Sequence, residues 1–181
     1  LDAWGDVALD VTFTDTGLTL TAREVTHQGD GNADVYIGTS ANDVMVSLGG
    51  ADKLNGGGGS DLLLGGEGDD MLSGGAGDDR LIGGLGTDTA DYSGSSFGVT
   101  VDLENGEGLD GEGGVDTLIS IENLIGSDHE DVFISNARDN VMIGGEGSDT
   151  FIFNAVDGGD DLIEDFTSGE DSVILSASAF G

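Results

Sequence analysis

The sequence predicts an all-β protein in which short parallel strands stack into a coil, and three observations predict it. The first is a nine-residue repeat that runs without insertion from Gly29 to Asp91. The second is that the sixth residue of every block is aspartate, and the eighth is apolar or largely so. The third is that four successive blocks open as Gly-Gly-x-Gly-x-Asp. Glycine permits tight turns with positive φ, and a strand points alternate side chains to opposite faces, so each block fits one turn and one short strand.

The repeat also predicts how the blocks stack. The sixth places hold Asp34, Asp43, Asp52, Asp61, Asp70, Asp79 and Asp88, and the eighth places hold Tyr36, Met45, Leu54, Leu63, Leu72, Leu81 and Ala90. If two blocks make one coil, turns on the same side are two blocks apart, so Asp61 is expected over Asp79 and Asp70 over Asp88. A flexible glycine-rich linker is the alternative interpretation, but a linker has no reason to keep an apolar residue at every ninth position.

The turns have the chemistry of a calcium site. A tight glycine turn presents carbonyl oxygens to its inside, and the aspartate adds a carboxylate. Calcium takes about six to eight oxygen ligands in irregular geometry. One turn supplies roughly half of such a shell, so two stacked turns are expected to share each ion, in two rows along the edges of the stack.

The blocks resemble the G-G-x-G-x-D-x-U-x nonapeptide of the RTX calcium-binding proteins, where U is a large apolar residue. The resemblance implies a right-handed parallel β-roll, a form of β-helix. It also implies sites in which one turn gives its second and fourth carbonyls and its aspartate, and the turn two blocks later gives its first and third carbonyls and its aspartate. The implied ligand sets are Gly57, Gly59 and Asp61 with Gly74, Ala76 and Asp79; Gly66, Gly68 and Asp70 with Gly83, Leu85 and Asp88; Leu48, Gly50 and Asp52 with Gly65, Glu67 and Asp70; and Thr39, Ala41 and Asp43 with Gly56, Gly58 and Asp61. The predicted metal-binding set in these blocks also includes Asp34, Gly49, Gly75 and Gly77.

A second group of nonapeptides begins at residues 111–119 and resumes over 126–152. Its sixth places are Asp116, Asp131, Asn140 and Asp149. The resemblance implies a site from Ser127, His129 and Asp131 with Gly144, Glu146 and Asp149, in which His129 contributes its carbonyl rather than its ring. Asn140 and Arg138 are expected to weaken the site between them. Asp161 and Asp165 in the acidic tail complete the predicted metal-binding residues.

The segments around the repeats predict five regions. Residues 1–28 contain two alternating runs around Asp15-Thr16-Gly17, which predicts a β-hairpin that either caps the roll or ends a preceding domain. Residues 29–91 form the first RTX block, 92–114 a strand followed by an acidic surface loop, 115–156 the second RTX block, and 157–181 a C-terminal β cap. Residues 92–103 and 116–127 resemble the connection between roll segments in secreted RTX proteases and polysaccharide-modifying enzymes.

Charge and composition exclude several classes of partner. The 181 residues carry 37 acids and 4 bases, a formal charge of −33, which argues against nucleic acid and anionic lipid. Two carboxylates about 4 Å apart repel by on the order of 4 kcal/mol at an effective dielectric constant near 20. The metal-free chain is therefore expected to be disordered, and calcium binding to supply folding energy. The chain has no cysteine, and no apolar run approaches the length of a membrane span, so no membrane insertion is predicted.

Catalytic motifs are absent from the sequence. It contains no His-Glu-x-x-His pair, no Gly-x-Ser-x-Gly elbow and no phosphate loop with lysine. Adjacent carboxylates such as Asp69 and Asp70 could form a glycosidase dyad, but they recur with the repeat, which favours calcium ligation over a unique catalytic site. The chain is predicted to be a non-catalytic part of a protein whose other part can be an enzyme.

The resemblance implies a function and partners. The leading hypothesis is a calcium-binding module of a bacterial protein exported by the type I secretion machinery, which folds outside the cell and helps a covalently attached cargo domain to fold. The alternative is a repeat module of an extracellular polysaccharide-modifying enzyme or an adhesin, with a glycan or another surface ligand as partner.

Overall fold

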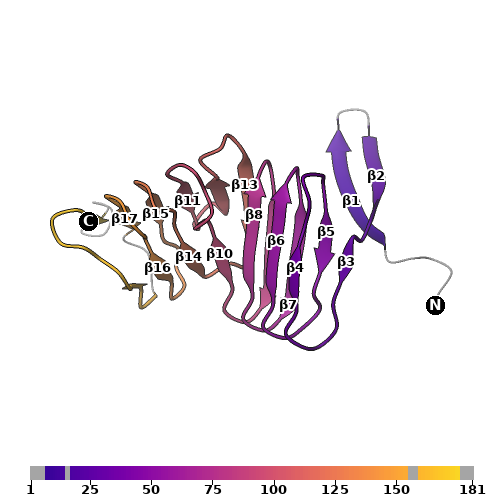
Figure 1. Cartoon of the computed structure of the whole chain (residues 1–181), viewed down its shortest axis with the longest axis horizontal. Coiled ribbons are helices and arrows are strands. Elements are labelled where there is room, and N and C mark those ends of the chain that lie inside the picture. The colour runs from indigo at the N-terminus through magenta and orange to yellow at the C-terminus, as the bar shows by residue number, and fades with distance from the viewer. Residues whose placement is uncertain (1–6, 15–16, 155–158, 176–181) are drawn as a thin grey trace.

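The computed structural model describes residues 7–14, 17–154 and 159–175, and these residues form strands, turns and bends but no helix. The strands stack along the long axis of the molecule, with the N-terminal hairpin at one end and the last strands at the other (Figure 1). Apart from the hairpin, they belong to two long sheets, one of seven strands and one of ten. The predicted all-β, parallel β-roll fold is confirmed.

Successive strands of the first block alternate between the two sheets. One sheet contains β3 (His27–Gln28), β5 (Val44–Val46), β7 (Leu62–Glu67) and β9 (Arg80–Leu85), and the other contains β4 (Val35–Ile37), β6 (Lys53–Gly58), β8 (Met71–Ala76) and β10 (Thr89–Asp91). Leu63 pairs with Leu81, and Leu54 pairs with Leu72, in parallel register. Two nine-residue blocks therefore make one coil, as the repeat predicts.

The connection between the two blocks adds strands to the ten-stranded sheet. It contains β11 (Thr100–Asp102), β12 (Glu107–Leu109) and β13 (Val115–Ile119). β13 pairs in parallel with β9, β11 pairs in parallel with β15, and β12 lies antiparallel between them. The prediction of a surface loop after β11 is therefore wrong for β12. Its glycine-rich acidic sequence is typical of a loop, but strands on both sides satisfy its backbone.

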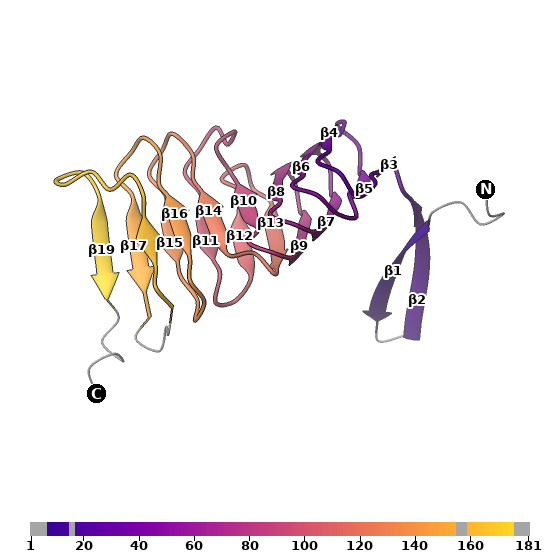
Figure 2. The same cartoon turned by 90° about the horizontal axis from the view of Figure 1, so that it is seen from below.

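The second block continues both sheets to the far end (Figure 2). The seven-stranded sheet continues from β10 through β14 (Asn123–Ile125), β16 (Val141–Ile143) and β18 (Leu162–Ile163), and the ten-stranded sheet continues from β11 through β15 (Val132–Ile134), β17 (Thr150–Phe153) and β19 (Ser172–Leu175). All of these neighbours pair in parallel. Among the described residues, β18 and β19 are the outermost strands at this end.

The predicted N-terminal hairpin is present as β1 (Val7–Thr14) and β2 (Gly17–Glu24), which pair antiparallel from Val7 with Glu24 to Thr14 with Gly17. Of its predicted turn, Asp15 and Thr16 lie outside the described residues. The two strands form a sheet of their own, so the hairpin does not extend either sheet of the roll.

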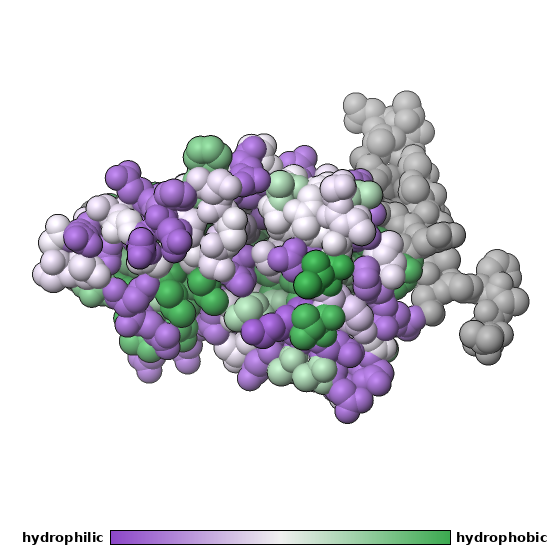
Figure 3. All heavy atoms as spheres, viewed as in Figure 1, coloured by the Kyte–Doolittle hydropathy of each residue, from purple (hydrophilic) through white to green (hydrophobic). Residues whose placement is uncertain are grey.

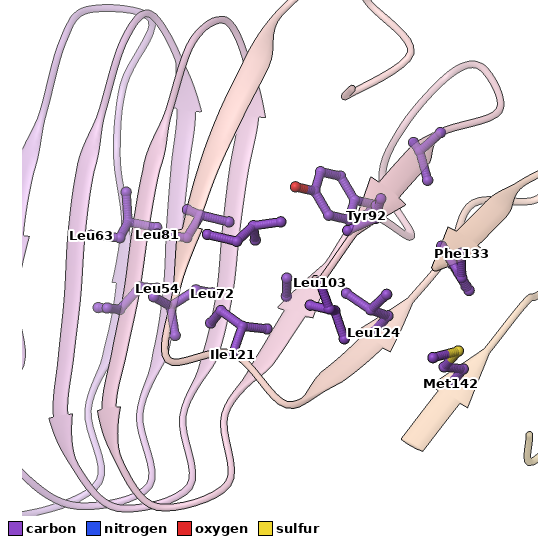
Figure 4. Close-up of a cluster of buried hydrophobic side chains, with 14 of the residues drawn as sticks. Leu54, Leu63, Leu72, Leu81, Tyr92, Leu103, Ile121, Leu124, Phe133 and Met142 are labelled. Atoms are coloured by element: carbon purple, nitrogen blue, oxygen red, sulfur yellow. The ribbon is translucent and has the colours of Figure 1, made fainter. Parts of the chain in front are cut away.

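The core is a ladder of the eighth-place side chains (Figure 4). The fully or almost fully buried members of this ladder are Met45, Leu54, Leu63, Leu72, Leu81, Ala90, Leu118, Phe133, Met142 and Phe151. Phe133 and Phe151 meet edge to face with their ring centres 5.8 Å apart. Each buried large apolar side chain contributes roughly 1.5–3 kcal/mol. The outer surface is mainly hydrophilic on the face seen in Figure 3, with hydrophobic residues in small patches.

Candidate metal centres

An aspartate side chain of each glycine turn forms a hydrogen bond with the backbone of the turn stacked against it. The Oδ1 atom of Asp61 accepts a hydrogen bond of 2.7 Å from the backbone N–H of Asp43, and Asp79 accepts an identical one from Asp61. Along the other edge, Asp88 accepts one of 2.9 Å from Asp70. The predicted stacking of Asp61 with Asp79 and of Asp70 with Asp88 is confirmed. The carboxylates thus form two rows, one along each edge of the stack.

The second oxygen of these aspartates distinguishes the turns. Five aspartates, each at most 3% exposed, have a buried Oδ2 atom without a hydrogen-bond partner: Asp52, Asp70, Asp79, Asp88 and Asp149. A buried charged oxygen without a partner is costly, so these atoms require a cation or a proton.

The electrostatics of the rows agree with this requirement. Burial raises the pKa of Asp79, Asp88 and Asp149 to about 6, against the opposing effect of the backbone N–H that each carboxylate accepts. Neighbouring carboxylates contribute to the same rise in pKa, Asp61 acting on Asp79 and Asp70 acting on Asp88. Without a cation, the rows therefore hold protons more tightly than isolated aspartates do.

Backbone carbonyls lie against the same turns. Gly75 and Gly77 have φ values of 94° and 122°, and a Cβ atom would lie 2.0 Å from the carbonyl oxygen of Gly57 at the first position and 1.9 Å from that of Gly59 at the second. Only glycine allows both the backbone conformation and this approach. The second- and fourth-place carbonyls that the repeat predicts as ligands therefore face the turn that is stacked on them.

The third-place carbonyls retain the capacity to bind an ion. The carbonyls of Glu67, Ala76 and Leu85 each accept one backbone hydrogen bond, of 2.8, 2.9 and 2.8 Å. The donor in each case is the fourth-place N–H of the turn two blocks earlier in the chain. A carbonyl oxygen has two lone pairs, so one hydrogen bond leaves the other free for an ion. Carbonyl and carboxylate oxygens are the hard ligands that calcium takes, and the donor set of these turns fits this ion.

Two predicted sites contain turns that differ. In the turn of Asp43, both the N–H and the hydroxyl of Thr39 donate to Oδ2 of Asp43, at 2.8 and 2.9 Å. In the turn of Asp131, the N–H of Ser127 donates to Oδ2 at 2.7 Å and the hydroxyl donates to Oδ1 at 2.9 Å. The structure therefore brings these predicted ligands together, but their carboxylates already have protein donors.

The remaining predicted residues lie at the C-terminal turns. Asp165 accepts the N–H groups of Gly144 and Gly145 at 2.9 and 2.8 Å, and Oδ1 of Asp161 accepts the N–H of Asn140 at 2.9 Å. The carbonyl oxygen of His129 would lie 2.6 Å from a Cβ atom at Gly147, so it faces the stacked turn as predicted for a carbonyl donor.

Three carboxylates of the rows were not among the predicted ligands. Asp116 accepts the N–H of Asp79, Glu122 accepts that of Asp88, and Asp171 accepts that of Asp149, each at 3.0 Å. The sixth place of Asp116 in its block is a signal in the sequence that could have identified it. Glu122 carries no such signal, because its short turn has no glycine pattern.

No group of three or more histidine, cysteine, aspartate or glutamate side chains that could hold a metal occurs in residues 7–14, 17–154 and 159–175. Nor does any helix in this part of the chain have the length and apolar character needed to cross a membrane.

Comparison with known families agrees with this geometry. Residues 28–63 and 55–90 match the family model of the RTX calcium-binding nonapeptide repeat, and residues 80–180 match that of the peptidase M10 serralysin C-terminal domain. The chain belongs to the serralysin C-terminal family, with RTX repeats. A comparison with curated proteins found no match. RTX domains of this family bind calcium, are typical of extracellular proteins exported by type I secretion, and are generally non-catalytic.

Proposed function

We propose that this RTX domain is a folding module that is disordered without calcium and folds when it binds several calcium ions outside the cell. In this way it supports export by the type I secretion machinery and the folding of a covalently attached cargo domain. The observation that carries the proposal is the set of five buried aspartate oxygens without a hydrogen-bond partner in stacked turns.

The charge of the chain makes calcium part of its folding energy. With a formal charge of −33, the chain repels itself, and the coil brings carboxylates of successive turns together along both edges. An ion between two turns replaces this repulsion by attraction. The unfolded chain has no such site, so the free energy of ion binding becomes free energy of folding. Extracellular calcium modules bind with dissociation constants of roughly 10⁻⁴–10⁻³ M, so cytosolic calcium would leave the chain unfolded for export.

The ligands follow the scheme of the repeat. One turn contributes its second and fourth carbonyls, the turn two blocks later contributes its first and third, and each turn adds its aspartate. For one ion these are Gly57, Gly59 and Asp61 with Gly74, Ala76 and Asp79. The carbonyls of Gly57 and Gly59 closely approach the stacked turn 74–79, which supports this assignment.

A calcium titration of the whole chain followed by far-ultraviolet circular dichroism tests the proposal. We expect a cooperative change from coil to β structure in the millimolar range. Magnesium is the matched control, and it should act much more weakly because it demands near-ideal octahedral geometry. A chain that is fully ordered in excess chelator would refute the proposal.

A further inference from the structure

The turns with an unpartnered aspartate oxygen share a backbone feature at their second residue. We call these the open turns: 47–52, 65–70, 74–79, 83–88 and 144–149. In all of them the second residue has a positive φ, and these residues are Leu48 (74°), Gly66 (112°), Gly75 (94°), Gly84 (124°) and Gly145 (100°). Leu48 is informative because residues with a side chain rarely adopt this conformation. It follows the geometry of the open turn, although it is not glycine.

A second kind of turn closes on itself. We call 38–43, 126–131 and 135–140 the closed turns. Their second residues are Thr39, Ser127 and Asn136, and none of them has a positive φ. In each, the N–H of the second residue donates to the side-chain oxygen of the sixth, at 2.8, 2.7 and 3.0 Å. The oxygen that an open turn leaves for an ion is therefore occupied by the turn itself.

The closed turn 135–140 also supplies a positive charge. Its sixth residue is Asn140, whose Nδ2 donates to the carbonyl of Glu122 at 2.9 Å. The Arg138 guanidinium of the same turn forms an ion pair with the carboxylate of Glu122. Glu122 is itself the row member that accepts the N–H of Asp88. An amide and a guanidinium thus contact the row where two turns would otherwise share an ion.

The other row has a protein donor at the same junction. Oδ1 of Asp116 accepts the N–H of Asp79 as in the open turns, but its Oδ2 accepts the hydroxyl of Tyr92 at 2.9 Å. Tyr92 lies between the leucine ladder of the first block and Phe133 and Met142 of the second (Figure 4). Both rows therefore meet a protein donor where the two blocks join.

We propose that the second residue of a turn decides whether that turn takes calcium, and that the closed turns and the junction of the two blocks are held by protein donors in place of ions. The open turns then form two separate groups, 47–52 with 65–88 on one side of a junction without metal and 144–149 on the other. This inference rests on the proposed calcium-dependent function and specifies which turns take part in it.

The experiment opens closed turns by single substitutions in the whole chain. In Thr39→Gly and Ser127→Gly, the hydroxyl is lost and the second residue can adopt a positive φ. Thr39→Ala and Ser127→Ala are the matched controls, because they lose the hydroxyl but keep a residue that favours negative φ and closes the turn through its N–H. Bound calcium ions are counted by native mass spectrometry at saturating calcium, and folding of every variant is checked by circular dichroism.

We expect each glycine variant to bind one calcium ion more than the unchanged chain and each alanine variant to bind the same number as the unchanged chain. Glycine variants that fold but bind the unchanged number of ions would overturn the inference, and so would alanine variants that gain an ion. Two positions are used so that a folding defect at one leaves the other informative. If the unchanged chain bound no calcium at all, the proposed function would fail, which is a different result.

Discussion

Oδ1 of Asp88 accepts the backbone N–H of Asp70 at 2.9 Å, while its Oδ2, equally buried, has no hydrogen-bond partner. One carboxylate thus fastens two turns together and leaves a charged oxygen for an ion. The same arrangement joins Asp52 to Asp70 and Asp61 to Asp79. The backbone hydrogen bond and the proposed calcium ion therefore use the two oxygens of the same carboxylate, which couples ion binding to the stacking of the coil.

The charge of Asp70 is expected to be essential for calcium binding. Asp70→Asn can still accept the N–H of Asp52 but removes the negative charge, so we expect loss of at least one ion and a higher calcium midpoint in the circular dichroism titration. Asp69→Asn is the matched control. It removes the same negative charge, but from an exposed side chain that accepts the N–H of Thr87. Equal midpoints for the two variants would contradict the assignment of Asp70.

Gly75→Ala tests the left-handed turn. Gly75 has a φ of 94°, and its new Cβ would lie 2.0 Å from the carbonyl oxygen of Gly57. The backbone conformation alone costs roughly 1–2 kcal/mol for a residue with a side chain. We expect a clear rise in the calcium concentration needed for folding. Gly58→Ala is the control, because its nearest new contact is an ordinary 3.8 Å, and an effect as large as that of Gly75→Ala would argue against the turn geometry.

Lowering the pH is expected to stabilise the folded form of the metal-free chain. The pKa values of Asp79, Asp88 and Asp149 are about 6 in the fold, above the ordinary value of 3.8, because burial disfavours their charged form. A raised folded-state pKa stabilises the fold fully below 3.8, and this contribution is lost as the pH rises through about 6.

We therefore expect β structure to increase in chelator as the pH falls from 7 towards 4. Calcium affinity should fall over the same range, because protons compete for the carboxylates. Circular dichroism against pH, with and without calcium, measures both effects. A metal-free chain that loses structure on acidification would show that the buried carboxylates do not control folding.

Tyr92→Phe removes the donor to Asp116 and retains the packing of the ring. Asp116 is fully buried, and its Oδ2 would lose its hydrogen bond, which costs about 1–3 kcal/mol. We expect a lower free energy of unfolding at saturating calcium, measured in a urea titration. Tyr36→Phe is the control, because it also removes a tyrosine hydroxyl, but one whose 3.1 Å bond to the carbonyl of Gln28 is exposed. Equal stability of the unchanged chain and Tyr92→Phe would count against the role of Tyr92.

Arg138→Gln removes the cation that faces Glu122. The guanidinium is largely exposed but Glu122 is mostly buried, so we expect a loss of about 1 kcal/mol and a melting temperature lower by about 2–4 °C in saturating calcium. Arg80→Gln is the control, since Arg80 is exposed and forms no ion pair among the described residues. The melting temperatures of the two variants are compared by scanning calorimetry. Equal values would show that the ion pair does not stabilise the fold.

Much of the fold follows from local pattern. The eighth places could be predicted as core because an apolar side chain recurs there and strand geometry sends it inward, as at Leu63 and Phe133. The turn residues could be predicted because glycine is needed for positive φ. β12 could not, because its sequence has the composition of a loop and becomes a strand only through its neighbours β11 and β13.

The parallel coil, its buried ladder and the two rows of aspartates follow from the amino-acid sequence alone, because all three depend on a period of nine residues within one stretch of chain. Which carboxylates keep an unpartnered oxygen could be seen only in the folded chain. That choice depends on backbone φ at Leu48 and on contacts such as Tyr92 with Asp116 and Arg138 with Glu122, which join residues whose spacing the repeat does not set.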